Sequence, residues 1–431
     1  MPFVNLRILE RRKCLDNNKK HFIREFVLIL NKKKARMSKK IRQDKISIFF
    51  CIMVQLFCKK TFFEGFMLKS VIIGAAHMHV NEIALYIDGQ PDTELCGIAD
   101  VFPNLEEITD KKYTRKWNLE NIKSKYGVRE YDDFEVMLDE VCPDVAYVLC
   151  ENSKKLDVAT KIAKRGVDIV LEKPMALNFE EAKQIADLKE NYGIDILINW
   201  PVAWRKYLYE MKLAIDSKTC GELQKIRYIN GHTGPLGKGA KHRGVATNAD
   251  EMTNEERKSI WWYRSECGGG AYMDILCYGC YFARWMFGRV PDDVFTVGQN
   301  LNTPFGDVED NVEAIMRYEN GVVIAEGTWT TPRKRMTTGP EAICSDGVVW
   351  CDGTPDAEAF VKAIDVYGNE VAVTQLEDDE RFKNMPWHYA AFKLGGESIH
   401  ETLTVEFNLD VTRMLDAARR SNESRRAEKV L

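Results

Sequence analysis

The sequence predicts an α/β protein in which a doubly wound parallel sheet is followed by an α+β domain with a mainly antiparallel sheet. Short apolar strand patterns alternate with helical patterns between Met67 and Asn199, as they do in doubly wound sheets. After Trp200 strand patterns follow one another, and Asn320-Gly321 joins two of them in a strong hairpin signal. A chain of 431 residues with 45% apolar content is long enough for two domains with full cores.

Residues 1–66 differ in composition from the rest of the chain. They hold 17 Lys and Arg against 5 Asp and Glu, a net charge of +12. Because the whole chain has a net charge of −4, the remainder has −16, which argues against a nucleic-acid partner. The apolar run 46–57 is shorter than the roughly 20 residues of a membrane span. We expect residues 1–66 to be a disordered extension or a mis-assigned start before Met67; a membrane-associated basic tail is the alternative.

The first domain, residues 67–198, is expected to form the parallel sheet. Its strand patterns are short apolar runs rich in β-branched residues, which is typical of strands buried on both faces. A helix over 75–88 is expected after the first strand, ending at Gly89. The expected strands are 68–73, 94–99, 144–150, 168–171 and 195–199.

The turn after the first strand has a partial dinucleotide-binding fingerprint. The usual pattern is Gly-x-Gly-x-x-Gly; here it is Gly74-Ala75-Ala76-His77-Met78-His79, and only the glycine of the tight turn remains. Asp100 ends the next strand, where a carboxylate can bind a ribose diol and repel a 2′-phosphate; a strand-end turn residue is the alternative. NAD is therefore expected in preference to NADP. His77 and His79 are expected to line the phosphate loop and to bind no metal, with metal ligation as the alternative.

The segment from Asp168 to Pro174 places a charged pair at the end of a strand. Glu172 and Lys173 are therefore expected at the carboxyl edge of the sheet, where open α/β sheets bind ligands. Burial can lower the pKa of a lysine toward neutrality, so Lys173 is a candidate proton donor or acceptor; an ordinary surface lysine is the alternative. The next helix has a capping-box variant, with Asn178 as N-cap and Glu181 three residues on.

The second domain, residues 199–431, is expected to hold one helix among its strands. Three glycines, 268–270, precede a helical pattern over 271–287. Asp274 and Tyr278 are four residues apart and share one face, so both could face a ligand near the helix start. The alternatives are a first-turn carboxylate that favours the helix dipole and a packed aromatic ring. The other expected elements are a helix over 204–217 and strands over 223–230, 294–299, 311–318 and 322–330.

Two further features bear on the chemistry that the chain could support. The 12 cysteines are scattered, and Cys277 and Cys280 lie in an apolar helical pattern, so we expect them to pack in the core. Free thiols are typical of a reducing compartment and predict a cytoplasmic protein. The glycine-rich loop from His232 to Arg243 either clamps a substrate carboxylate or is a solvated charged loop.

Six segments together resemble one protein family. The Glu-Lys-Pro motif, with a triple glycine and an aspartate about a hundred residues later, is the most specific part. The segments are Val71-Ile-Ile-Gly74, Asp100, Tyr131-Asp-Asp-Phe134, Glu172-Lys-Pro-Met-Ala-Leu177, Gly268-Gly-Gly-Ala-Tyr-Met-Asp274 and Trp285-Met-Phe-Gly288. From Met67 to the C-terminus, the chain resembles the glucose–fructose oxidoreductase/inositol dehydrogenase family (Gfo/Idh/MocA).

The resemblance implies a Rossmann domain, a β-sheet substrate domain that often mediates oligomers, and a nicotinamide cofactor. It implies that Lys173 is the active-site lysine and that the Lys173–Pro174 bond is cis. Asp274 and Tyr278 are the residues expected to act with Lys173 in the reaction. The cofactor-binding residues that it implies are Gly74, Ala76, His77, Met78, Asp100, Cys150, Asn152, Glu172, Lys173 and Pro174.

The chain departs from the family pattern at three sites, one of which is the phosphate loop, where two of the three glycines are missing. Many relatives have a histidine four residues after the helix aspartate, where this chain has Tyr278. A phenol beside an ammonium group could serve as acid or base, because the positive charge lowers its pKa. The segment 151–155 also lacks the family's common histidine.

The expected function is hydride transfer between a nicotinamide cofactor and a sugar, polyol or related hydroxy compound. The substrate alcohol would lose its proton to Tyr278 or Lys173, while Asp274 binds a substrate hydroxyl or holds the acid/base in place. Two alternatives remain: a redox-neutral lyase, epimerase or glycosidase that retains NAD, and a non-catalytic NAD-binding protein. The expected partners are a small-molecule substrate and other copies of the chain, with no nucleic acid and no membrane span.

Overall fold

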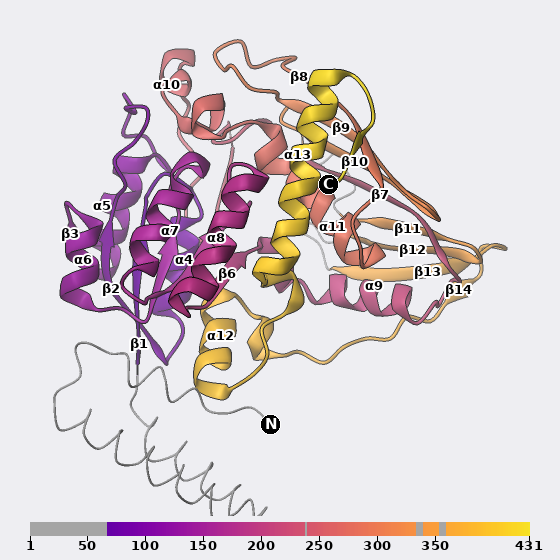
Figure 1. Ribbon diagram of the computed structural model, residues 1–431, viewed down its shortest axis with the longest axis horizontal. Coiled ribbons are helices and arrows are strands. Elements are labelled where there is room, and N and C mark those ends of the chain that lie inside the picture. Colours follow the sequence, from indigo (N-terminus) through magenta and orange to yellow (C-terminus); the bar gives the residue numbers. More distant parts are fainter. Residues whose placement is uncertain (1–66, 238, 333–338, 353–358) are drawn as a thin grey trace, which may run out of the picture.

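The computed structural model describes residues 67–237, 239–332, 339–352 and 359–431. The expected extension, residues 1–66, lies outside these ranges. Within them the chain forms two sheets with helices packed on them (Figure 1). The domain limits, 67–198 and 199–431, stay a prediction.

The first sheet has six parallel strands in the order β3-β2-β1-β4-β5-β6, as expected of a doubly wound fold. β4 and β6 are buried along their whole length, because helices cover both faces of the sheet. The strands are β1 (Leu68–Ile73), β2 (Thr93–Ala99), β3 (Glu130–Tyr131), β4 (Val145–Val148), β5 (Asp168–Glu172) and β6 (Ile196–Asn199). The helices between them are α4 (Val80–Asp88), α5 (Arg115–Tyr126), α6 (Phe134–Val141), α7 (Lys155–Ala163) and α8 (Phe179–Tyr192).

Helix starts follow local hydrogen bonding in this domain. The Asn178 side chain accepts a 2.9 Å hydrogen bond from the Glu181 backbone N–H and caps α8, as predicted. α4 is shorter than predicted and begins at Val80. The preceding residues form a loop instead, since the Ala75 N–H donates to Asp100 Oδ1 at 2.8 Å and the His77 N–H donates to the Leu149 carbonyl at 3.1 Å.

The second sheet has nine strands in the order β14-β13-β12-β11-β7-β10-β9-β8-β15. β7 and β10 pair in parallel, and the other pairs described in this sheet are antiparallel. The predicted β9–β10 hairpin is confirmed, with Tyr318 opposite Gly321. The strands are β7 (Leu223–Gly231), β8 (Asp293–Gln299), β9 (Asn311–Tyr318), β10 (Gly321–Thr328), β11 (Glu341–Cys344), β12 (Gly347–Asp352), β13 (Phe360–Asp365), β14 (Glu370–Val371) and β15 (Glu428–Lys429).

Helices cover one face of this sheet and reach the first domain. The expected helix over 271–287 begins with a π-helical turn, Tyr272–Leu276, which continues into an α-helix. Cys277 and Cys280 are buried within it with free thiols, as predicted. The helices here are α9 (Lys206–Asp216), α10 (Asn254–Lys258), α11 (Cys277–Phe287), α12 (Met385–Ala390) and α13 (Val405–Ser424).

The C-terminal helix α13 joins the two halves of the molecule. It lies between α8 of the first domain and α11 and β8 of the second (Figure 1). Trp200 Nε1 donates to Asn408 Oδ1 at 2.8 Å, and the Phe179 N–H donates to Asp416 Oδ2 at 2.9 Å. These bonds fix the carboxyl edge of the first sheet against the second domain. Within the described ranges, none of the helices combines the length and apolar character needed to cross a bilayer.

Candidate active site

Lys173 lies where the two domains meet. It follows β5 directly, and its peptide bond to Pro174 is cis, as the resemblance implies. Its side chain is 2% exposed, and its Nζ donates to the Asp274 carbonyl at 2.8 Å and to Asp274 Oδ1 at 3.0 Å. The fold therefore brings together a lysine and an aspartate that are 101 residues apart in the sequence. The alternative interpretation of Lys173 as an ordinary surface lysine is therefore wrong.

Tyr278 is the third member of this group. Lys173 Nζ lies 4.7 Å from the centroid of the Tyr278 ring, which is a cation–π contact in a buried setting. Asp274 lies in the π-helical turn, and Tyr278 lies in the α-helix that follows it. Both residues nevertheless contact the same ammonium group. The contact with Lys173 is through the ring face. The three residues predicted to be catalytic are therefore adjacent.

The pKa of Lys173 is opposite to our expectation. Burial alone would lower it, but Tyr278 and Asp274 outweigh burial and hold the pKa well above that of an ordinary lysine. Burial raises the pKa of the Asp274 carboxyl, yet Lys173 and His232 bring it below its usual range. Burial raises the pKa of the Tyr278 phenol, and the opposing effect of Lys173 is smaller. At neutral pH the group is an ammonium, a carboxylate and an un-ionised phenol.

Two residues that the sequence did not predict also contact the Asp274 carboxylate. Trp329 Nε1 donates to Oδ2 at 3.1 Å, and His232 Nε2 lies 3.4 Å from the same oxygen. They come from neighbouring strand ends, since β7 and β10 pair in parallel with Gly231 beside Thr328. That pairing was the missing signal, because a sequence shows where strands end but not which of them are neighbours. Two later residues of the 232–243 loop lie away from Asp274: the His242 ring lies 6.0 Å from the His79 ring, and Arg243 Nη1 contacts the Tyr86 hydroxyl at 2.9 Å.

Lys155 is a second buried lysine that the sequence did not predict. It is 1% exposed, and its Nζ donates to the carbonyls of Glu172 and Pro174, at 2.6 Å each. It therefore holds the backbone on both sides of Lys173. Burial lowers its pKa to about 8.

The phosphate loop after β1 needs its single glycine. Gly74 has φ +92°, and a Cβ atom there would lie 2.5 Å from the Cys150 backbone nitrogen. The Ala76 carbonyl accepts from Trp261 Nε1 at 2.9 Å, and Met78 is buried. Asn152 Nδ2 donates to the Gly268 carbonyl at 2.7 Å, and its part in cofactor binding stays a prediction.

Buried polar atoms without partners cluster around this loop. They are His77 Nε2 and Glu151 Oε2. Buried polar groups usually have hydrogen-bond partners, so these atoms fit a polar ligand such as a dinucleotide. One ligand atom from each of His77, His79 and Glu172 also lies within 4.8 Å of the others, as metal ligands would. However, His79 Nδ1 lies 3.2 Å from Glu172 Oε1, and the absence of a metal stays a prediction.

Asp100, predicted to bind a ribose diol, already contacts several groups of the chain. Its Oδ1 accepts from the backbone N–H groups of Ala75 and Val101, at 2.8 Å each. Arg115 Nη1 donates to both Asp100 oxygens at 2.8 Å, and Arg115 Nη2 donates to Glu151 Oε1 at 2.7 Å. Two carboxylates thus surround one guanidinium. The Asp100 side chain remains 19% exposed.

A segment of the second domain covers the phosphate loop. The Trp262 ring lies 4.7 Å from the His77 ring, measured between centroids. Lys112 Nζ pairs with Asp250 Oδ1 at 2.9 Å, and the Tyr113 hydroxyl donates to the Thr247 carbonyl at 2.9 Å. A dinucleotide bound at this loop would therefore be enclosed by both domains.

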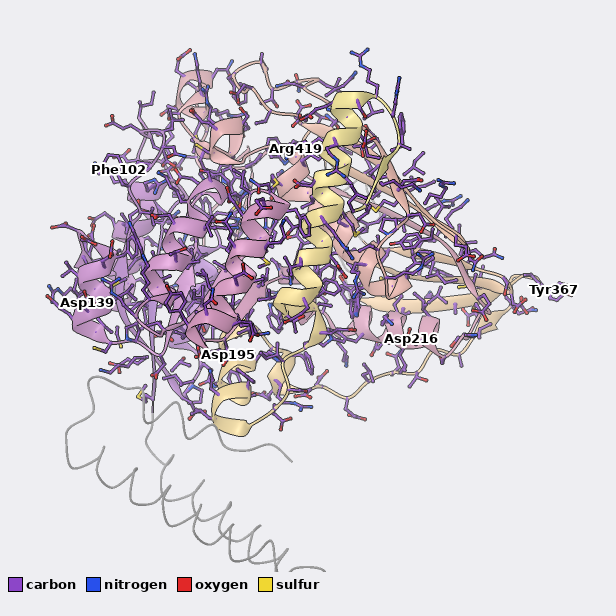
Figure 2. All side chains as sticks on the ribbon, in the orientation of Figure 1. Phe102, Asp139, Asp195, Asp216, Tyr367 and Arg419 are labelled. Atoms are coloured by element: carbon purple, nitrogen blue, oxygen red, sulfur yellow. The ribbon has the colours of Figure 1, made fainter. Side chains whose placement is uncertain are left out.

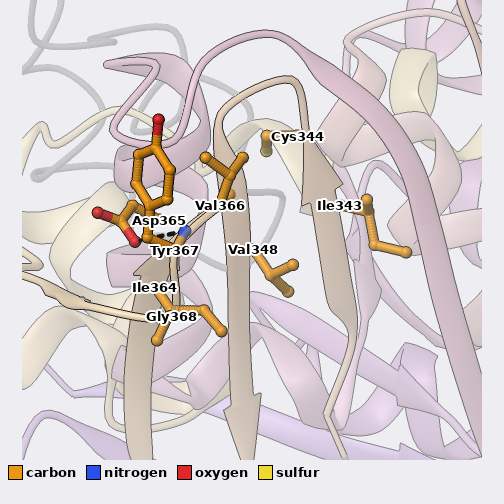
Figure 3. A pocket seen from close by; sticks show the side chains of 9 residues that line it. Ile343, Cys344, Val348, Ile364, Asp365, Val366, Tyr367 and Gly368 are labelled. Atoms are coloured by element: carbon orange, nitrogen blue, oxygen red, sulfur yellow. Dashed lines mark hydrogen bonds between the residues drawn. The ribbon is translucent and has the colours of Figure 1, made fainter.

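One surface hollow lies away from this group of residues. Its volume is about 550 Å³, and its walls come from the ends of β11, β12 and β13 (Figure 3). Tyr367 on its rim is 87% exposed and projects from the end of the molecule opposite Phe102 (Figure 2). Asp365 is the one ionisable carboxylate in its lining, and that side chain already accepts from the N–H groups of Tyr367 and Asn369. We therefore do not assign it to the reaction.

Comparison with known families agrees with this geometry. Residues 68–199 match the family described as "Oxidoreductase family, NAD-binding Rossmann fold", and residues 209–349 match the "GFO/IDH/MocA C-terminal domain". The chain belongs to the Gfo/Idh/MocA family. The family and fold predictions are both confirmed.

Individual members of the Gfo/Idh/MocA family are distant from this chain. The rhizopine catabolism protein MocA of Rhizobium meliloti is 25% identical over 191 residues, which are 44% of this chain and 52% of that protein. The scyllo-inositol 2-dehydrogenase (NAD(+)) of Bacillus subtilis is 23% identical over 205 residues, 47% of this chain and 53% of the relative. The chain thus aligns with about half the length of the curated relatives it matches.

Solved structures of the family share the fold. The aldose-aldose oxidoreductase of Caulobacter crescentus, complexed with glycerol, has a TM-score of 0.66 and 18% identity, and the match covers 84% of this chain and 99% of that one. The WlbA dehydrogenase of Bordetella pertussis, in complex with NADH and UDP-GlcNAcA, has a TM-score of 0.63 and 18% identity, covering 84% and 98%.

Proposed function

We propose that this protein is an NAD(P)-dependent oxidoreductase that acts on a CH–OH group of a sugar, polyol or related hydroxy compound. The observation that supports this most is the buried Lys173 ammonium on Asp274, at the carboxyl edge of a dinucleotide-binding sheet and facing a second sheet. The family match and the partnerless polar atoms around Gly74 support a nicotinamide cofactor there. When bound, that cofactor would accept or supply a hydride.

The residues of the chain supply orientation and charge. The Lys173 ammonium would donate a hydrogen bond to the reacting substrate oxygen and stabilise negative charge on it. Asp274 fixes the ammonium through Oδ1, and the Tyr278 ring face packs against it in a dry setting. Ala76, His77, Met78, Cys150, Glu172 and Pro174 would form the cofactor wall.

NAD is favoured over NADP because of the charges around Arg115. The guanidinium donates to Asp100, to Glu151 and to the Val101 carbonyl, so most of its hydrogen-bond donors are already used. Two carboxylates around one guanidinium leave a net negative site, which repels a 2′-phosphate.

We expect Asp100→Asn to shift this preference toward NADP. The amide keeps an oxygen for the Ala75 and Val101 N–H groups but removes one negative charge and frees Arg115. The affinity for NADP relative to NAD should rise by roughly tenfold or more, since one charge repulsion near a protein surface is on the order of a few kcal/mol. Fluorescence titration with both cofactors uses the 9 tryptophans of the chain. Glu94→Gln, an equal charge change at an exposed position of β2, is the control and should leave the ratio unchanged.

The covering segment favours a second candidate function. A cofactor enclosed by Trp262 and the Lys112–Asp250 pair would leave slowly. Slow release suits a redox-neutral lyase, epimerase or glycosidase that retains NAD and oxidises its substrate only transiently.

A panel of sugars and polyols, followed at the absorbance of NADH, tests the proposal. A dehydrogenase should form NADH with many turnovers per site when NAD is in excess. The retaining enzyme should reduce at most one bound cofactor per site, while its substrate is still consumed. A protein that binds NAD but neither reduces it nor consumes any substrate of the panel would contradict both candidates.

The second sheet also supports self-association. Phe295, Ile315 and Ile324 lie side by side in register on the outward face of β8, β9 and β10, each at least 40% exposed. Such an apolar ladder on a sheet face suits a homo-oligomer interface. Analytical ultracentrifugation of the protein and of an Ile315→Glu variant tests this, and equal monomeric masses would contradict it.

A further inference from the structure

We propose that His232 is the proton acceptor and donor of the reaction; this assignment rests on the proposed oxidoreductase function. The imidazole lies at the end of β7, against the Asp274 carboxylate that also fixes Lys173. No other histidine described in the structure pairs with Asp274. His232 thus shares one carboxylate with the lysine that would bind the substrate oxygen.

The geometry gives the two imidazole nitrogens different roles. Nε2 lies 3.4 Å from Asp274 Oδ2, so this nitrogen would carry the hydrogen in the neutral ring. Nδ1 then has a free lone pair, and it is buried without a hydrogen-bond partner. A partnerless buried nitrogen beside a buried ion pair is what a substrate hydroxyl would satisfy. Imidazole is also the side chain best suited to exchange protons near neutral pH.

The surroundings fix the ring while leaving it open to exchange. The His232 and Trp329 rings are nearly parallel, at 16°, and Trp329 Nε1 donates to the same Asp274 oxygen. The His232 N–H donates to the Thr328 carbonyl at 3.0 Å, which ties its backbone to β10. The side chain is nevertheless 38% exposed, in contrast to Lys173 at 2%. Solvent therefore reaches the ring although Nδ1 itself is buried, and the proton would pass to water once the product has left Nδ1.

When an alcohol is oxidised, His232 would accept one proton from the substrate. The substrate C–H bond breaks and its electron pair leaves with the hydrogen as hydride to the oxidised nicotinamide dinucleotide, which is reduced. The substrate O–H bond breaks, its proton binds His232 Nδ1, and a C=O double bond forms. The imidazolium faces the Asp274 carboxylate and passes the proton to water. In the reverse direction His232 returns the proton to the oxygen.

Two variants separate a proton-transfer role from a structural one. His232→Gln keeps a side chain that can donate to Asp274 but cannot exchange a proton at neutral pH. His232→Ala leaves a space that is open to solvent and can admit free imidazole. Both should lose turnover by roughly 10²-fold or more with the best substrate of the panel, the usual scale for general acid–base catalysis, while circular dichroism and NAD affinity stay close to those of the unmodified protein.

Chemical rescue decides the assignment. Added imidazole should restore turnover to His232→Ala, and a series of substituted imidazoles should restore it in the order of their basicity. Lys173→Met is the control and should not respond to imidazole. Turnover near that of the unmodified protein in His232→Gln would overturn the assignment, as would an Ala variant that imidazole does not accelerate. Absence of any substrate conversion by the unmodified protein would overturn the proposed function, and this assignment with it.

Discussion

Lys173→Met should keep the fold and most of the cofactor affinity but lose turnover by roughly 10²–10⁴-fold, the combined scale of a lost electrostatic contact and impaired proton transfer. Methionine has a similar length and suits a buried site, so the loss is of charge rather than of volume. The variant also leaves the Asp274 carboxylate without its ammonium partner, so that its Oδ1 has lost a 3.0 Å contact. Steady-state kinetics with the best substrate, alongside a thermal melt, measures both effects.

Tyr278→Phe is the matched comparison. Because Lys173 contacts the ring face rather than the hydroxyl, phenylalanine retains the cation–π contact. The phenol also stays protonated, since burial raises its pKa and Lys173 offsets this only in part. We therefore expect a loss of no more than a few-fold. A Tyr278→Phe variant as slow as Lys173→Met would assign the proton to the phenol after all, and two fully active variants would contradict the proposed chemistry.

Lys155→Met should change how stability depends on pH. Burial lowers the pKa of Lys155 to about 8 from the 10.5 of an ordinary lysine. Between these values the folded protein has released a proton that the unfolded chain still binds, so this group makes the protein more stable as pH rises from 8 to 10.5. The gain approaches about 3 kcal/mol, at 1.36 kcal/mol for each pH unit. Urea unfolding at several pH values should show this rise in the unmodified protein relative to Lys155→Met.

Lys393→Met is a control, because Lys393 contacts the first residue of β5 and Lys155 contacts the last. Lys393 Nζ contacts Asp168 Oδ2 at 2.6 Å and also pairs with Asp195. Burial lowers its pKa, but the two carboxylates outweigh burial and raise it. Its stabilising effect is therefore fully present below pH 10.5 and is lost only above that value. The difference between the unmodified protein and Lys393→Met should be large but flat from pH 8 to 10.5. A flat difference for Lys155→Met as well would mean that Lys155 keeps an ordinary pKa.

The sequence predicted the strands β1, β2 and β4 to β10, but it did not predict β3 or β11 to β15. Apolar runs, glycines and the Asn178 cap are local signals, and the elements that depend on them were found. The predicted helix start at Ala75 was wrong because groups far along the chain, Asp100 and the Leu149 carbonyl, hold this segment as a loop. α13 was missed although local signals for it exist, since Thr404 caps it and Val411, Met414, Leu415 and Ala418 are buried at helical spacing.

The sequence predicted only those residues of the candidate site that stand in local motifs. Lys173, Asp274 and Tyr278 stand in recognisable motifs, and the fold brings them together. Their protonation did not follow from the sequence, since burial alone predicts a lower pKa for Lys173 and only its neighbours reverse the direction. His232 reaches Asp274 because β7 pairs with β10. Lys155 donates to a backbone carbonyl next to Lys173. Neither arrangement has a spacing that can be found along the chain.

The position of α13 has a consequence for how the protein is made. Phe179 at the start of α8 and Trp200 directly after β6 hydrogen-bond to residues of α13, which are synthesised more than 200 residues later. At the usual 5–20 residues per second, the ribosome needs roughly 10 seconds or more to supply that helix. During this interval the flank of α8 and the edge of β6 stay exposed on the nascent chain. We expect this surface to be the one that chaperones bind, and C-terminal truncation within α13 to give aggregation rather than an isolated, stable first domain.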